Sequence, residues 1–68
     1  MTYKMRVIFW DVKRETRKRV DNVHQIQSSM DIVNGRMTKR WMLCIGDDVE
    51  YLPQRHYQIE RVELMPEI

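Results

Sequence analysis

The stretch "MDIVNGRMTK" at residues 30–39 contains the dipeptide Asn34-Gly35 between two runs with apolar side chains at alternate positions. Both central positions of a two-residue β-turn need a positive φ angle, which Asn and Gly tolerate better than other residues. The stretch therefore predicts a β-hairpin that joins a strand over 24–33 to a strand over 36–45.

Alternation on both sides of this turn supports the hairpin. Each run places apolar side chains on one face, interrupted in the first run by Ser28: Ile26, Met30 and Ile32 in the first, and Trp41, Leu43 and Ile45 in the second. A period of two residues is typical of a strand with one buried face.

The segment "YKMRVIFW" at residues 3–10 predicts another strand with a core face. Its side chains alternate between a wholly apolar face and a mixed one: Tyr3, Met5, Val7 and Phe9 on the first, and Lys4, Arg6, Ile8 and Trp10 on the second. After a turn near "DVK", a strand around residues 14–20 is expected to return antiparallel to it.

Turn-forming residues divide the rest of the chain into short elements. "GDD" at 46–48 predicts a turn before a short strand, "VEYL". Pro53 is expected to open a helical turn through "QRHY", and "QIERVEL" to form the last strand.

The apolar composition favours an all-β fold. Val and Ile together number 13, whereas Leu occurs 3 times and Ala is absent. β-Branched side chains suit the pleated surface of a sheet, whereas Ala and unbranched residues favour helices. We expect residues 1–68 to form one small domain, an antiparallel meander of five or six strands curled into an SH3-like barrel or sandwich.

One segment leaves an alternative open. The apolar residues between 16 and 33 also recur at intervals of three and four: Val20, Val23, Ile26, Met30 and Val33. This spacing is typical of an amphipathic helix, which would give an α+β fold instead. The β-branched residues and the polar "DN" and "SS" pairs favour the strand.

The residues that usually carry chemistry are scattered. His24, Cys44 and His56 match no known metal-site spacing, and no glycine-rich or oxyanion-hole element accompanies them. We therefore expect no metal, no cofactor, no small-molecule substrate and no enzyme activity. The single cysteine fits a reducing compartment, and no apolar run reaches signal-peptide or membrane-span length, so we expect a cytoplasmic protein without a membrane-spanning segment.

Basic residues are concentrated in "KRETRKRV" at 13–20. Candidate polyanion-binding residues are Lys13, Arg14, Arg17, Lys18 and Arg19, with Arg36, Lys39 and Arg40 beyond the Asn-Gly turn. One interpretation is an edge strand protected by charge against pairing with other sheets, because such a strand carries charge on both faces and cannot be central. The other is contact with nucleic acid or with an acidic protein surface.

Two strands become apolar on both faces near one end. The residues concerned are Ile8 and Trp10 on the first strand, and Met42 with Cys44 after the hairpin turn. Either the barrel closes over these ends, or Ile8, Trp10 and Met42 form an exposed protein-binding patch.

Three function classes follow. The first is a non-enzymatic protein-binding module, which also leaves a homodimer open; a phage or mobile-element accessory protein that inhibits a host protein would be of this kind. The second is a nucleic-acid-binding β domain that uses the basic edge. The third is a structural subunit.

Overall fold

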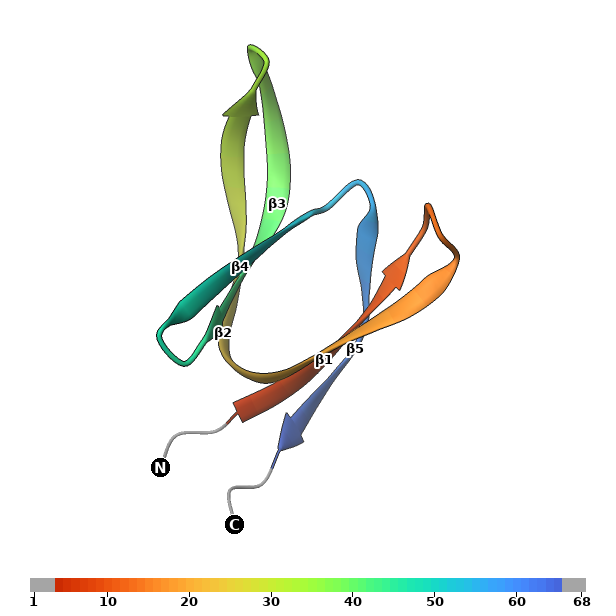
Figure 1. The fold of residues 1–68 in the computed structure, drawn as a ribbon, viewed down its shortest axis with the longest axis vertical. Coiled ribbons are helices and arrows are strands. Elements are labelled where there is room, and N and C mark those ends of the chain that lie inside the picture. The colour runs from red at the N-terminus through yellow and green to blue at the C-terminus, as the bar shows by residue number, and fades with distance from the viewer. Residues whose placement is uncertain (1–3, 66–68) are drawn as a thin grey trace.

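Residues 4–65 of the protein form a single antiparallel sheet of five strands. The computed structural model describes residues 4–65. Its strands are β1 (Lys4–Asp11), β2 (Thr16–Val33), β3 (Arg36–Ile45), β4 (Asp48–Pro53) and β5 (Tyr57–Met65), and their order across the sheet is β4-β3-β2-β1-β5. The all-β prediction is confirmed, and the helix alternative for 16–33 is wrong because that whole segment is one strand (Figure 1).

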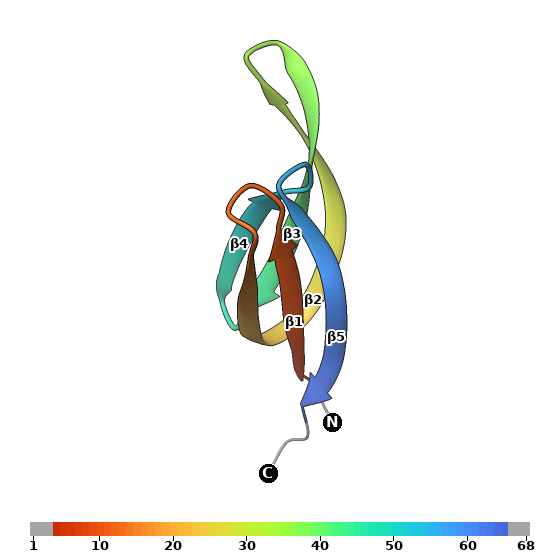
Figure 2. The same cartoon turned by 90° about the vertical axis from the view of Figure 1, so that its right-hand side faces the viewer.

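The length of β2 explains how one sheet encloses a core. Residues 16–23 of β2 pair with β1, and residues 23–33 pair with β3. The register shifts on both sides of Val23, and Asn22 has a positive φ of 62°, so β2 bends where it changes partners. The strands expected over 14–20 and 24–33 are therefore two halves of one bent strand, visible in Figures 1 and 2.

The bend folds the sheet over on itself around a small core. One layer contains β5, β1 and the first half of β2, and the other contains the second half of β2, β3 and β4 (Figure 1). The buried apolar residues come from both layers: Val7, Phe9, Val20, Val23, Leu43 and Leu52. The core face predicted for the first strand is confirmed at Val7 and Phe9, while Tyr3 lies outside the described residues.

The two layers are tied together without being closed into a barrel. No ladder joins β4 to β5 within residues 4–65. Instead, the Trp41 Nε1–H donates to the Tyr57 carbonyl oxygen at 3.0 Å, and the Lys18 ammonium lies 3.6 Å from the Glu50 carboxylate. These contacts link β3 to β5 and β2 to β4 across the core.

The predicted turns take the expected positions. Asn34 and Gly35 have φ angles of 51° and 76°, as a two-residue hairpin requires, and Gly46 has a φ of 61° in the turn before β4. After Pro53 the chain makes one tight turn, closed by the His56 N–H on the Pro53 carbonyl at 3.2 Å, instead of the expected helical turn.

The β2–β3 hairpin continues beyond the core as a two-stranded ribbon (Figure 1). We call residues 29–40 the arm. The arm helps to give the molecule its elongated dimensions of 45 × 26 × 14 Å. The sequence predicts the shared face of Ile26, Met30 and Ile32, but only Ile26 packs against the core. Met30 and Ile32 are 50% and 70% exposed because the arm extends beyond the second layer of the sheet (Figure 1).

Candidate binding surfaces

The basic run begins in the β1–β2 turn and enters the first half of β2. β2 is central in the strand order, so the expectation that the strand over 14–20 cannot be central is wrong for the strand as a whole. Residues 16–22 nevertheless pair only with β1, because β3 begins its pairing at Val23. The run therefore lies on a local free edge, as the protected-edge interpretation requires.

The eight predicted polyanion-binding residues occupy two separate regions. Lys13 and Arg14 lie in the β1–β2 turn, before the first residue of β2. Arg36 follows the Asn-Gly turn after the last residue of β2. The structure thus places the two basic groups at opposite ends of an 18-residue strand, not on one continuous surface (Figure 1).

Acidic side chains of the same chain neutralise much of the run. Arg17 Nε lies 2.9 Å from a Glu60 carboxylate oxygen, and Arg19 Nε lies 3.5 Å from Asp21. Together with the Lys18 pair to Glu50, these contacts give each cation on the first half of β2 an acidic neighbour. The local field is weaker than the sequence indicates, and attraction for a polyanion is reduced accordingly.

Ile8 and Trp10 are two positions apart in sequence and therefore neighbours on the outer face of β1, and side chains of the adjacent strands lie beside both. The Arg17 guanidinium carbon lies 5.5 Å from the centre of the Trp10 indole, within cation–π range. Ile8 lies between its cross-strand partners Arg19 and Arg61. The two residues are half-buried.

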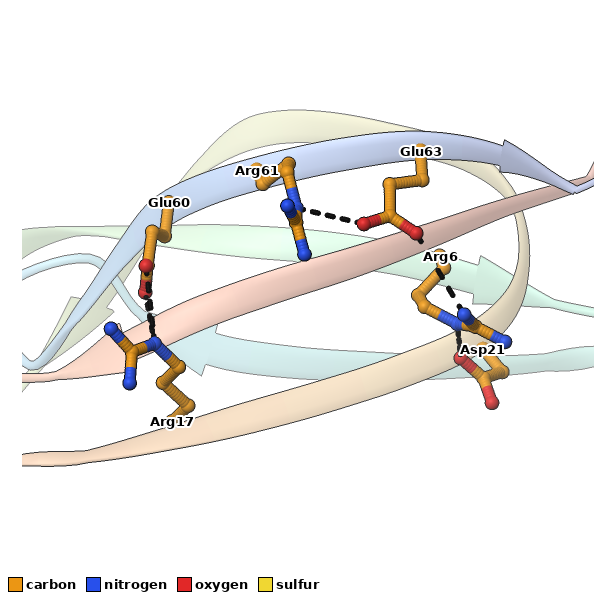
Figure 3. Close-up of polar contacts among 6 residues, drawn as sticks. All are labelled: Arg6, Arg17, Asp21, Glu60, Arg61 and Glu63. Atoms are coloured by element: carbon orange, nitrogen blue, oxygen red, sulfur yellow. Dashed lines mark hydrogen bonds and ion pairs between the residues drawn. The ribbon is translucent and has the colours of Figure 1, made fainter.

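A set of ion pairs continues this cover across β2, β1 and β5 (Figure 3). We call it the charged cover. Arg6 bridges Asp21 at 2.9 Å and Glu63 at 3.7 Å, while Arg61 contacts Glu63 at 2.7 Å. Arg17 and Glu60 form its other end beside Trp10. The outer face of this layer therefore presents paired charges instead of an open apolar patch.

Met42 lies on the other layer. It is opposite Tyr51 in the β3–β4 ladder, and the Arg40 guanidinium carbon stacks 3.8 Å from the centre of the Tyr51 ring. Arg40 also pairs with Asp31 at 3.1 Å. The structure thus brings Met42 and Arg40 together, while Ile8 and Trp10 remain two strands away on β1.

The arm carries the apolar surface that the sequence interpretation missed. Ile32 and Met37 are directly opposite in the ladder and 70% and 68% exposed, and Met30 is opposite Lys39 on the same face. These four side chains form one patch, which we call the arm face. Its signal in the sequence is Ser28, which interrupts the apolar face where the hairpin leaves the core.

A groove of about 510 Å³ lies where the arm meets the β4–β5 turn. It is lined by Val33, Met37, Thr38, Lys39, Pro53, Gln54 and Arg55. Gln54 fixes this junction, since its backbone N–H donates to the Lys39 carbonyl at 3.0 Å and its side-chain amide donates to the Ser28 hydroxyl at 2.6 Å. The base of the arm is therefore attached to the body, and only its far end is free.

Within residues 4–65 no three His, Cys, Asp or Glu side chains are grouped to hold a metal ion. Across the same residues, no helix has the length and apolar character needed to cross a bilayer. No protein-family model matches the sequence, and comparison with curated proteins and solved structures gives no significant match.

Proposed function

We propose that the protein is a non-enzymatic protein-binding module that contacts its partner through the arm face. The observation that carries the proposal is the exposure of Ile32 and Met37, 70% and 68%, on a ribbon that extends beyond the core. An isolated two-stranded ribbon is only marginally stable in water, so contact with a partner would both bury this surface and hold the ribbon.

The chemistry of the arm indicates the kind of partner surface. Arg36 and Lys39 have no acidic partner within the described residues, and Arg55 at the edge of the groove has none either. Methionine, isoleucine and uncompensated cations together fit an apolar depression with an acidic rim. The proposal includes a cytoplasmic location, because the single cysteine, Cys44, fits a reducing compartment.

Met30 and Val49 provide a matched test. They are 50% and 49% exposed, but Met30 lies on the arm face and Val49 on β4. A photo-crosslinking amino acid is placed at either position, and the protein is irradiated in extract from its native source with and without nuclease. We expect a discrete protein adduct from position 30, little from position 49, and no effect of nuclease.

The binding face is then removed without touching the crosslinker. Ile32→Ser with Met37→Ser changes exposed side chains, so thermal unfolding is expected to shift little while the adduct at position 30 is lost. Equal adducts at positions 30 and 49, or an adduct unaffected by the two serines, would contradict the proposal. An adduct that nuclease abolishes would favour a nucleic-acid-binding domain instead.

A further inference from the structure

β5 forms an edge of the sheet and carries exposed apolar side chains. Within residues 4–65 its only ladder partner is β1. Val62 and Leu64 lie opposite Val7 and Met5 on the inner face, yet they are 46% and 70% exposed. A free edge with exposed apolar side chains is a template for pairing with another strand.

The backbone groups of this edge are oriented for such pairing. The Tyr57 carbonyl points away from β1, since it accepts the Trp41 Nε1–H. N–H and C=O directions alternate along a strand, and the register shift beside Phe9 inserts one extra residue in β5, so the outward set continues at Val62 and Leu64. The same two residues therefore offer both outward hydrogen-bonding groups and exposed side chains.

The charge pattern of β5 is complementary to that of a second, antiparallel copy of the same strand. In "ERVEL" at 60–64, Arg61 and Glu63 flank Val62 symmetrically. If two β5 strands pair antiparallel about a two-fold axis at Val62, each Arg61 is opposite Glu63 of the other copy. Centring the axis on either neighbour would instead put two arginines or two glutamates face to face, which is unfavourable.

The opposite face of the strand is also complementary to itself. With the axis at Val62, the two copies of that residue are directly opposite, and each Leu64 lies diagonally beside them within side-chain reach. Arg61 and Glu63 are on the outer face, where their exposed fractions are 65% and 35%. One arrangement thus covers the apolar pair on one face and joins opposite charges on the other.

We propose that two copies of the chain associate through β5, antiparallel and centred on Val62, so that their sheets become continuous across a two-fold axis. This interface does not use the arm face, which remains free in both copies. The inference therefore goes beyond the proposed function and can fail independently of it.

Charge exchange tests the register. Arg61→Glu and Glu63→Arg each place like charges opposite one another in a homodimer, and we expect each to raise the dimer dissociation constant by about tenfold or more. An equimolar mixture of the two variants restores both opposite-charge pairs, and so does the double variant within one chain. We therefore expect association to return in both cases, as measured by sedimentation equilibrium.

Disulfide trapping gives a second readout that does not depend on charge. In a Cys44→Ser background, Val62→Cys places two thiols across the axis, where Cα atoms of a hydrogen-bonded pair lie about 5.5 Å apart and a disulfide can form. Leu64→Cys is the control: residue 64 is more exposed, but its two copies lie more than about 12 Å apart in this register. We expect rapid dimer crosslinking for Val62→Cys and little for Leu64→Cys.

The outcomes decide the proposal. Wild-type protein that stays monomeric at every concentration, or a mixture of the two charge variants that fails to associate while both remain folded, would overturn it. Leu64→Cys crosslinking as fast as Val62→Cys would also overturn it, because that result indicates random collision. Loss of association by Ile32→Ser with Met37→Ser would move the interface to the arm.

Discussion

Apolar side chains are covered on the outer face of β1 but exposed on the arm face. Trp10 lies on a strand with neighbours on both sides, and these neighbours supply Arg17 and Glu60 to cover it. Ile32 and Met37 lie on a ribbon that has no third strand, and both remain bare. Both regions carry large apolar side chains, but only the arm face lacks a cover from the other residues between 4 and 65.

The difference shows that exposure depends on the neighbouring strands as well as on the face. Long Arg and Glu side chains can cover an apolar residue only when they project from an adjacent strand on the same face. β1 has strands on both sides over nearly its whole length, whereas the far end of the arm, which carries Ile32 and Met37, has only the ladder between β2 and β3. Exposed apolar contact surfaces are therefore expected at unpaired strand edges and at the ends of two-stranded ribbons.

The largest contrast is expected between a core residue and the arm. Phe9 is fully buried and makes an edge-to-face contact with Tyr57 at a centroid distance of 6.3 Å. Phe9→Ala should cost about 3–5 kcal/mol of unfolding free energy, close to the whole stability of a small domain, whereas Ile32→Ala should cost about 0.5 kcal/mol or less. Urea unfolding monitored by circular dichroism measures both; similar losses would mean that the arm is packed.

The two turns at the ends of β2 should differ in their response to acid. The buried Asp11 carboxylate accepts the backbone N–H groups of Arg14 and Lys13, and these bonds, the first above all, hold its pKa below the ordinary value of 3.8 although burial opposes them. In the described part of the chain no carboxylate accepts a hydrogen bond from the backbone of the Asn34-Gly35 turn, which is formed by the positive φ angles of these two residues.

The pKa of Asp11 is lower in the folded protein than in the unfolded chain. As the pH falls, the unfolded chain therefore takes up the proton first. The stabilisation is therefore complete above about pH 4 and is lost as the pH falls further. Asp11→Asn keeps an acceptor oxygen and should flatten this acid dependence, whereas Asp11→Ala should weaken the turn at every pH. Thermal unfolding from pH 2 to pH 7 measures this; an unchanged acid limb in Asp11→Asn would assign the effect to other carboxylates.

A smaller effect is expected at Trp10, because its ring is half-buried beneath Arg17. Trp10→Ser should cost about 1 kcal/mol of unfolding free energy, well below the cost of Phe9→Ala. Thermal unfolding of both variants under identical conditions makes the comparison. If the two are equally destabilised, Trp10 belongs to the core and the contrast between covered and buried residues disappears.

The smallest effect should come from the charged cover itself. Arg17→Gln removes an exposed ion pair with Glu60 and should change the unfolding free energy by about 0.5 kcal/mol or less. It should nevertheless uncover the indole, so acrylamide should quench the Trp10 fluorescence more strongly. Measuring quenching in a Trp41→Phe background isolates that signal; unchanged quenching would show that Arg17 does not shield the ring.

Local features of the sequence were sufficient for the first strand and for the hairpin turn. Alternation in 3–10 placed Val7 and Phe9 in the core, and Asn34-Gly35 located the hairpin turn, because both signals depend on backbone geometry within a few residues. The bend at Asn22 could not be predicted in this way. A bulge depends on which strand lies on each side, and that information is distributed along the whole chain.

The same distinction between local and distributed information applies to the candidate binding surfaces. The sequence by itself determined that basic side chains gather at 13–20 and that Trp10 faces away from Phe9, because composition and strand alternation are local properties. Only the tertiary structure decided that Glu60 and Glu50 neutralise part of that basic run, since these partners come from strands far along the chain. It likewise decided that Ile32 and Met37 are exposed, because burial requires an opposing layer and the arm extends beyond that layer (Figure 1).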